Sequence, residues 1–206
     1  MQSPDTNSEI VPAAAEDAAL VAGVIAAAFH NLEAARWQIP DDDQRRAVFP
    51  AMFLDYVHHA LGHGSVEITA DACSAAVWTV ETGAPTPAPE PVAGRLRSAL
   101  GEAAEKVHLF DLALHARLPV GTPFEKLALL GVRPDCQNRG LGSALLAYHL
   151  AGLDRRLVPA YLEASSKASR ELYLRFGFFD LGEPIELPGG PLMYAMWREP
   201  LGVQPS

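Results

Sequence analysis

The sequence predicts a mixed α/β (α+β) fold in which a sheet of about six to seven strands is flanked by helices. The chain has 206 residues, 49% of them hydrophobic and 20% charged, a composition that suits one folded domain over residues 1–206. After residue 125, short apolar runs alternate with helical patterns in the order β-α-β-α-β. Before this region, two apolar runs flank a polar turn, which is typical of an antiparallel meander. Together these patterns predict one mixed sheet.

The first part of the chain predicts a short edge strand followed by a helix. Residues 1–9 are polar and are expected to be flexible, whereas Ile10 and Val11 begin the strand. Glu16 and Asp17 suit the positive end of a helix. Apolar residues at spacings of three and four form the stripe that we expect to pack on the sheet, namely Leu20, Val24, Ala27 and Ala28.

A second helical region is predicted to begin after Pro40. The aspartates at 41–43 are N-cap candidates, Pro50 perturbs the helix, and Gly62 and Gly64 end it.

The meander and a long insertion follow this helical region. Strands are predicted at 65–69 and 74–80 around a turn at Asp71. Residues 83–118 then form an insertion, which begins with a proline-rich loop and continues with one or two helices. Because the flanking segments share one pattern, the loop is interpreted as an exposed flap and not as a linker between domains.

The remaining elements are predicted from apolar runs, helical spacing and glycine stops. They are a buried strand at 126–132, a helix from Leu141 to Leu153, a strand at 160–164, a helix at 169–176, and closing strands at 178–181 and 192–197. Within this order, the turn between the buried strand and the first helix is the segment richest in glycine.

The charge balance restricts the partners of the protein. Sixteen Lys and Arg residues against 25 Asp and Glu residues give a net charge of −9. Since phosphate affinity comes mainly from clustered cations, nucleic acid is not an expected partner. The same negative field would attract a cationic amine.

Cysteine use and hydropathy predict a cytoplasmic protein with no membrane anchor. Cys73 and Cys136 are too far apart for a CxxC site, and two cysteines cannot form the framework of a small secreted protein. The apolar stretch at 18–29 is about half the ~20 residues that a membrane span needs, and acidic residues precede it. A reducing compartment is therefore expected.

A glycine-rich turn at 137–142 carries the chemical signal. It joins a buried strand to a helix N-terminus, where free backbone N–H groups and small residues suit a pyrophosphate. A loop without a ligand is the alternative interpretation. A Walker loop is excluded because Ser143 follows Gly142 where a lysine is required, and a dinucleotide fingerprint is excluded by Leu145.

Two motifs in order resemble the GCN5-related N-acetyltransferase (GNAT) superfamily. They are Val132-x-Pro134 followed by Gln137-x-x-Gly140-x-Gly142, and Leu172-Tyr173-x-x-x-Gly177-Phe178. The resemblance covers roughly Glu125 to Phe179 and implies a sheet splayed at the cofactor-binding strand. Weaker features, including Ala76-Val-Trp-Thr79 and the tail at 191–200, are most similar to the puromycin N-acetyltransferase type of actinobacteria.

The resemblance implies a site for acetyl-CoA, and no metal is expected because the seven histidines form no metal-ligand pattern. The pantetheine arm would pair with the backbone of Leu130, Gly131 and Val132. Residues with predicted contacts to the pyrophosphate and its surroundings are Gln137, Asn138, Arg139, Gly140, Leu141, Gly142 and Ser143. Ser166 and Ser169 stand where relatives often carry an asparagine that contacts CoA.

The same resemblance suggests an acid and a base for acetyl transfer. Tyr173 matches the tyrosine near the CoA sulfur and would protonate the departing thiolate. Glu163 matches a glutamate that serves as base in some members, and Glu125 is the alternative base. Packing is the competing interpretation for Tyr173, and a solvated carboxylate is the competing interpretation for both glutamates.

The acceptor pocket is expected at the end of the first helix. Candidate residues there are Phe29, His30, Asn31, Glu33, Arg36 and Trp37, while Trp78 could stack on the acceptor or belong to the core. The leading hypothesis is N-acetylation of a small or antibiotic-like amine. Alternatives are a protein N-terminal or lysine acetyltransferase and a non-catalytic acyl-CoA-binding protein. The oligomeric state, including a homodimer, is left open.

Overall fold

The computed structural model describes residues 9–91 and 94–202, in which eight strands form a mostly antiparallel mixed sheet. The strand order is β1-β2-β3-β4-β5-β8-β6, and β7 also pairs with β8. This confirms the predicted fold class, with the two-residue strand β7 as an addition. The sequence predicts that residues 1–9 are flexible. Of these, residues 1–8 lie outside the described residues.

The elements follow the predicted order. The strands are β1 (Ile10–Pro12), β2 (Gly64–Thr69), β3 (Ser74–Glu81), β4 (Phe124–Val132), β5 (Ala160–Ala164), β6 (Phe179–Asp180), β7 (Ile185–Glu186) and β8 (Leu192–Arg198). The helices are η1 (Ala15–Asp17), α1 (Ala18–Phe29), α2 (Glu33–Gln38), α3 (Asp42–His63), α4 (Gly94–Leu100), α5 (Ala103–His115), η2 (Pro134–Cys136), α6 (Leu141–Arg156) and α7 (Lys167–Arg175). Helix α2 was not predicted as a separate element.

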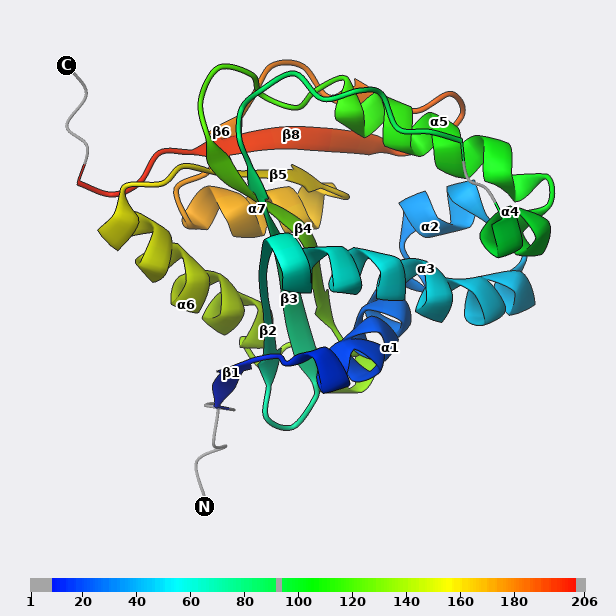
Figure 1. Ribbon diagram of the computed structural model, residues 1–206, viewed down its shortest axis with the longest axis horizontal. Helices are drawn as coiled ribbons and strands as arrows, with labels where there is room; N and C mark the ends of the chain where they lie inside the picture. The colour runs from blue at the N-terminus through cyan, green and yellow to red at the C-terminus, as the bar shows by residue number, and fades with distance from the viewer. Residues whose placement is uncertain (1–8, 92–93, 203–206) are drawn as a thin grey trace.

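The sheet is splayed between β4 and β5, as predicted. These two strands pair in parallel only from Glu125 to Leu127, while β4 continues to Val132 along β3. Figure 1 shows β2, β3 and β4 running at a steep angle to β5 and β8. Beyond Leu127, the edge of β4 that faces β5 is therefore left without a neighbouring strand.

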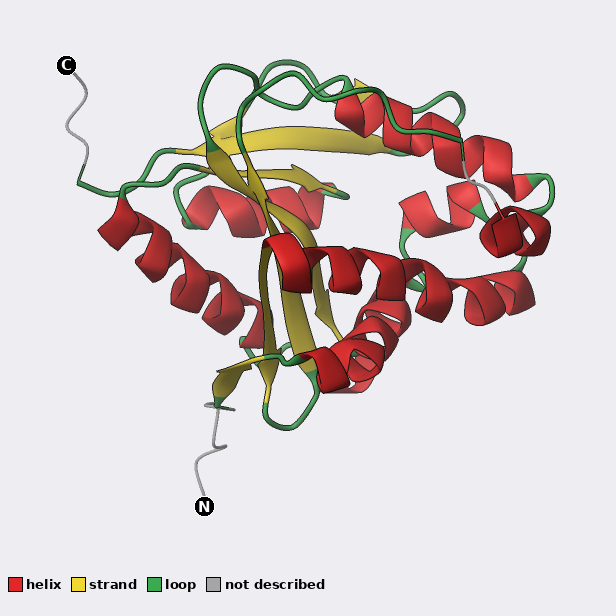
Figure 2. Ribbon diagram, in the orientation of Figure 1, coloured by secondary structure: helices red, strands yellow, loops and turns green. Residues whose placement is uncertain are grey.

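Helices cover both faces of the sheet. Helices α1 and α3 pack with Ile68, Val77 and Leu129 in one core cluster. Helix α6 packs on the opposite face, with Leu127 and Leu162 in a second cluster. Figure 2 shows the inserted helices α4 and α5 beside α3 and α2, so the insertion extends the first helical layer.

The predicted face of α1 is partly wrong. Val24 is buried, but Leu20 is 51% exposed and Ala27 is also exposed. Helix α1 lies between β4 and α3, and it buries Val21 and Ile25 there instead. A helix that packs on two neighbours needs a different apolar face from one that packs on a sheet alone.

Helix α3 confirms the predicted N-cap region and continues through its proline. The side chain of Asp41 accepts a hydrogen bond from the Gln44 backbone N–H at 2.7 Å, which satisfies one of the free donors of the first turn. The helix then passes through Pro50 and Gly62 and ends at His63. No helix among residues 9–91 and 94–202 combines the length and apolar character needed to cross a bilayer.

Candidate active site

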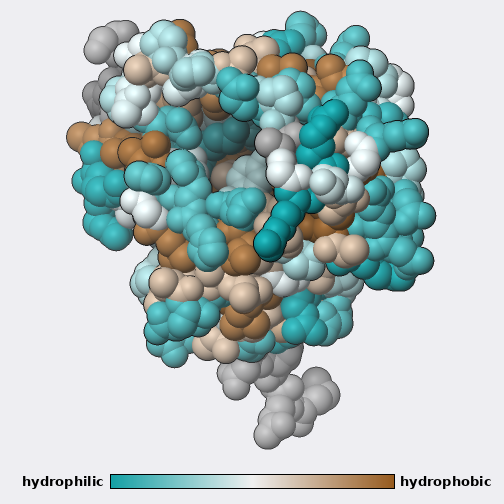
Figure 3. Space-filling view, turned by 45° about the vertical axis from the view of Figure 1, so that its right-hand side comes forward, coloured by the Kyte–Doolittle hydropathy of each residue, from teal (hydrophilic) through white to brown (hydrophobic). Residues whose placement is uncertain are grey.

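A cavity of about 970 Å³ occupies the region of the splay. Its walls come from β4, β5, α3, α5, α7 and the start of α6. Figure 3 shows a deep recess, with hydrophilic residues along much of its rim, on the side of the molecule that comes forward in that view. The divergence of two strands thus creates a space large enough for a small molecule.

The glycine-rich turn forms one end of this cavity. Asn138 and Gly140 have positive φ values of 61° and 77°, and this left-handed backbone turns the chain into α6. The first bond within the helix runs from the Ala144 N–H to the Gly140 carbonyl, at 2.9 Å. As at any helix start, the N–H groups of the residues before Ala144 have no partner within the helix. The turn therefore offers backbone donors and a partial positive charge.

Most of the predicted cofactor residues line the same cavity. Those that do are Leu130, Gly131, Val132, Gln137, Asn138, Gly140, Leu141, Gly142, Ser143, Ser166 and Ser169. Segments that are more than 20 residues apart in the sequence, 130–143 and 166–169, are therefore brought to one wall. Arg139 is the exception among the predicted residues.

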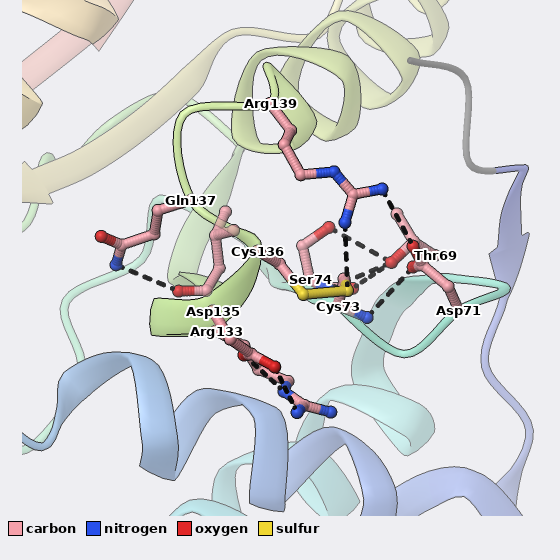
Figure 4. The surroundings of a disulfide bond; sticks show 10 residues. Thr69, Asp71, Cys73, Ser74, Arg133, Asp135, Cys136, Gln137 and Arg139 are labelled. Carbon is pink, nitrogen blue, oxygen red and sulfur yellow. Dashed lines mark hydrogen bonds and ion pairs between the residues drawn. A yellow bond between two sulfur atoms is a disulfide. The ribbon is translucent and has the colours of Figure 1, made fainter. Parts of the chain in front are cut away.

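Arg139 points away from the cavity toward the turn between β2 and β3 (Figure 4). Its guanidinium lies 3.7 Å from a carboxylate oxygen of Asp71 and 3.8 Å from the sulfur of Cys73. Cys73 is joined to Cys136 by a disulfide, with 5.8 Å between the two Cα atoms. The predicted contact of Arg139 with the pyrophosphate is replaced by a contact that holds the turn. The disulfide was not predicted from the sequence.

Ser166 and Ser169 use their hydroxyls to cap α7. The Ser169 N–H donates to the Ser166 hydroxyl at 3.1 Å, and the Ser166 N–H donates to the Ser169 hydroxyl at 3.0 Å. This reciprocal capping box fixes the start of the helix that carries Tyr173. The two serines line the cavity, but their side chains are already engaged with each other.

Tyr173 and Glu163 both line the cavity, from α7 and β5 respectively. Tyr173 is 8% exposed, and burial raises the pKa of its phenol. The edge of one ring faces the other where Tyr173 packs on Phe178, so the phenol is held in place. The Glu163 carboxylate accepts a bond from the Lys126 ammonium at 2.9 Å, and that pair sits largely out of solvent.

Glu125, the alternative base, does not line the cavity and is not a solvated carboxylate. It is 6% exposed and accepts bonds from His149 Nε2 at 2.8 Å and from Arg156 at 2.6 Å. The other ring nitrogen of His149 bonds Glu67 at 2.7 Å. A buried network of charged residues thus joins α6 to β2 and β4, away from the cavity.

Trp78 packs against that network and is not an acceptor contact. Its ring is fully buried and stacks on His149, with 4.0 Å between the ring centroids. Trp37 is also outside the cavity wall, because its indole N–H donates to the Pro188 carbonyl at 3.1 Å and its ring lies against Gly190. Core packing is therefore correct for Trp78, and the expected acceptor role of Trp37 is not supported by its position.

Of the other residues expected at the acceptor pocket, Phe29 lines the cavity. His30, Asn31, Glu33 and Arg36 do not, and the His30 ring bonds the Asp42 carboxylate at 2.8 Å. The wall is built instead by successive turns of α3 and α5, including Phe53, Tyr56 and Asp111. Apolar residues at helical spacing in the insertion were visible in the sequence, but nothing local indicated which way that face would point.

No group of three or more His, Cys, Asp or Glu side chains in the described part of the chain is arranged to hold a metal ion. The cavity is lined by a helix N-terminus, a buried phenol, carboxylates and apolar side chains.

Comparison with known proteins agrees with this geometry. Residues 102–179 match the family model of the acetyltransferase (GNAT) domain. A crystal structure described as histone acetyltransferase HPA2 and related acetyltransferase, from Corynebacterium glutamicum, is 28% identical, with a TM-score of 0.69 and coverage of 96% of this chain and 97% of that chain. The match over residues 102–179 and the similar acetyltransferase structure together support an N-acetyltransferase enzyme.

More distant structures share the fold. Arylalkylamine N-acetyltransferase 2 from Aedes aegypti is 13% identical, with a TM-score of 0.61 and coverage of 93% of this chain and 98% of that chain. An agmatine N-acetyltransferase is 15% identical, with a TM-score of 0.56 and coverage of 91% and 97%. GNAT acetyltransferases use acetyl-CoA. The end of the cavity at the glycine-rich turn is the region where such a molecule would have to fit.

Proposed function

We propose that the protein transfers the acetyl group of acetyl-CoA directly to the primary amine of a small molecule. The continuity of the cavity carries this proposal. One space touches the glycine-rich turn, the phenol of Tyr173 and an apolar compartment between α3 and α5. Direct transfer requires both substrates in one space, and this cavity supplies two compartments that meet near a buried proton donor.

The turn fits an anionic ligand. A side chain added at Gly142 would meet only Val132 and Leu130, at 3.6 and 4.0 Å, so nothing blocks the approach to its backbone. The pyrophosphate would be held by backbone N–H groups of residues 140–143, with Gln137 and Asn138 beside them. The unpaired edge of β4 at 130–132 would bond the amide groups of the pantetheine arm as an added strand does. Acetyl-CoA supplies the activated thioester.

Tyr173 is proposed as the acid and Glu163 as the base. Because burial raises the pKa of the Tyr173 phenol, its hydroxyl stays protonated over the whole neutral range and is ready to protonate a leaving thiolate. Glu163 lies on the opposite strand of the splay and would accept the amine proton, with Lys126 orienting its carboxylate.

A protein acceptor is the second candidate, because a structure 28% identical to this chain is described as a histone acetyltransferase. The insertion argues for a small acceptor. Helix α5 and Pro89 of the proline-rich loop both line the cavity, so the acceptor compartment is covered where a polypeptide would need an open groove. A puromycin-like acceptor is one member of the small-molecule class and belongs in the test.

Calorimetry and a thiol-release assay test the proposal. We expect CoA and acetyl-CoA to bind, and a panel of small amines, including puromycin, to accelerate CoA release with formation of the N-acetyl product by mass spectrometry. Release with lysine peptides alone would favour the protein acceptor, and absence of CoA binding would refute the proposed site.

Two broader expectations belong to the same proposal. The whole chain, residues 1–206, is proposed to be one acetyltransferase domain with the insertion at 83–118. A cytoplasmic location is favoured by composition and opposed by the disulfide, since such bonds are rare in reducing compartments. Cell fractionation and non-reducing mass spectrometry check both the location and the bond.

A further inference from the structure

One face of the inserted helix α5 and the segment after it forms a wall of the acceptor compartment. The residues of this wall recur at helical spacing, namely Val107, Phe110, Asp111, Leu114, His115 and Leu118. Asp111 is the only acidic residue on this otherwise largely apolar stripe.

The opposite wall comes from α3. Phe49, Met52, Phe53 and Tyr56 recur at the same spacing and line the cavity, and Phe53 makes edge contacts with Phe29 and Phe49. The compartment between α3 and α5 is therefore rich in aromatic rings and suits an apolar body.

Two of the charged side chains in this compartment pair with each other, whereas the carboxylate of Asp111 has no such partner among the described residues. Lys126 and Glu163 form a short ion pair, so the ammonium of Lys126 is already neutralised. Within residues 9–91 and 94–202, the Asp111 carboxylate has neither a hydrogen bond nor an ion pair shorter than 4 Å. His108 and Lys126 influence the carboxylate only through space, and both lower its pKa.

Burial in the cavity wall disfavours the ionised form of Asp111 when no cation is bound. Burial raises the pKa of Asp111 to about 6, against the opposing influence of His108 and Lys126. Titratable groups around it come from four elements, His108 and His115 from α5, Lys126 from β4, Glu163 from β5 and Tyr56 from α3. At neutral pH the carboxylate is ionised and partly buried, without a hydrogen-bond or ion-pair partner among the described residues, a state that a bound cation would stabilise.

We propose that Asp111 binds the cationic group of the acceptor, so that the acceptor is a lipophilic amine with an aromatic or alkyl body and no acidic group. This inference rests on the proposed function and names its substrate class. An acidic group on the acceptor would meet Asp111 and Glu163 in a compartment whose lysine is already paired. The aromatic rings of α3 would contact the body of the amine.

Binding of 2-phenylethylamine, tryptamine and octylamine tests the inference by calorimetry, without requiring turnover. We expect Asp111→Asn to weaken binding of these amines at pH 7 by about 10-fold or more, because a hydrogen bond to a charged group is lost. Glu105→Gln is the matched control, since it removes one exposed carboxylate from the same helix outside the cavity. The uncharged 2-phenylethanol is expected to bind both proteins equally.

The pH dependence separates a binding role from a structural one. In the wild type, amine affinity is expected to rise between pH 5 and pH 7 with a midpoint near 6, as the Asp111 carboxyl ionises. Asp111→Asn should lack this rise, and Asp111→Glu should keep one. Unchanged acetyl-CoA affinity shows that the variants are folded.

Equal amine affinity in wild type and Asp111→Asn would overturn the inference while leaving acetyl transfer intact. Absence of acetyl transfer to every amine would instead refute the proposed function, even if amine binding depends on Asp111. The two failures are therefore distinguishable.

Discussion

Tyr173 illustrates how a single buried group can be prepared for proton transfer. Its position on α7 is fixed from both ends of the helix, by the capping box of Ser166 and Ser169 and by the contact of its ring with Phe178. The phenol thus lies in the cavity wall with its proton retained at neutral pH, since burial raises its pKa. Such a group is useful as an acid only if the leaving thiolate is brought to it.

Replacement of Tyr173 by phenylalanine tests this role. We expect Tyr173→Phe to lower kcat by about 100-fold, the lower end of the usual contribution of a positioned acid. Acetyl-CoA affinity should remain within about twofold, because the ring is kept. Tyr148→Phe, which alters an exposed tyrosine of α6, is the control. Steady-state thiol release and calorimetry make the measurement, and full turnover by Tyr173→Phe would remove the acid assignment.

His149 is a second residue whose surroundings determine its protonation state. Both ring nitrogens lie within 2.8 Å of a carboxylate oxygen, and because ionised carboxylates only accept, both nitrogens donate and the ring is an imidazolium. Burial alone would lower the pKa of His149, but the hydrogen bonds and charges of Glu125 and Glu67 outweigh burial and raise it. The folded state therefore binds this proton more tightly than the unfolded state.

Because His149 holds its proton more tightly in the folded state, the free energy of unfolding depends on pH. The stabilisation from protonated His149 is fully present below its ordinary pKa of about 6.5 and is lost as the pH rises through the raised pKa of the folded state. We expect His149→Gln to lower the free energy of unfolding by about 3 kcal/mol at pH 6, because it leaves the buried Glu67 carboxylate without a cationic partner and leaves Glu125 with Arg156 alone.

Urea titrations between pH 6 and pH 9 measure this effect. The difference between wild type and His149→Gln should shrink with rising pH, whereas His58→Gln, at an exposed position of α3, should show no such trend. A difference that is constant across this range would contradict a protonated His149.

At the scale of elements, β4 combines two roles along its length. Its first residues, from Glu125 to Leu127, pair with both β3 and β5, whereas its last residues pair with β3 alone. The C-terminal end of β4 also packs against α1. A side chain at Gly131 would lie 2.9 Å from the Ala28 Cβ and 3.0 Å from Ile25, so only glycine allows this close approach of helix to strand.

Gly131→Ala tests that packing. We expect it to lower the free energy of unfolding by about 1–3 kcal/mol, the usual cost of overpacking a core. Gly23→Ala, on the helix α1 that packs against Gly131 but with open space around it, should raise stability by about 0.5–1 kcal/mol through helix propensity. Chemical denaturation of both variants makes the comparison, and a neutral Gly131→Ala would show that α1 can move away from β4.

At the scale of the whole molecule, local patterns in the sequence predicted what is local in the structure. The motif from Val132 to Gly142 identified the turn and its helix, because glycine positions and helix spacing are properties of neighbouring residues. The face of α1, the position of Asp111 and the partners of Arg139 could not be predicted in this way. Each depends on which elements, distant in sequence, pack together, as when α5 is placed opposite α3.

The disulfide between Cys73 and Cys136 is another such long-range feature. The two cysteines are 63 positions apart in the sequence, and the bond joins the turn before β3 to η2, just ahead of the glycine-rich turn. The bond and the Arg139 contacts both connect the meander to the start of α6, on the side away from the cavity. The loop that it closes contains α4, α5 and β4, so its removal enlarges the conformational freedom of the unfolded chain more than that of the folded one.

Reduction of this bond is expected to destabilise the whole molecule without altering its fold. We expect a reducing agent to lower the free energy of unfolding by about 2–4 kcal/mol, the usual contribution of a native disulfide. The Cys73→Ser, Cys136→Ser double variant should equal the reduced protein and should not respond to the reducing agent, which separates the bond from other effects of the reagent. Denaturation curves with and without reductant make the measurement, and intact mass under non-reducing conditions shows whether the bond is present. Equal stability of the oxidised and reduced chain would mean that the Arg139 contacts and β3–β4 pairing already hold these segments together.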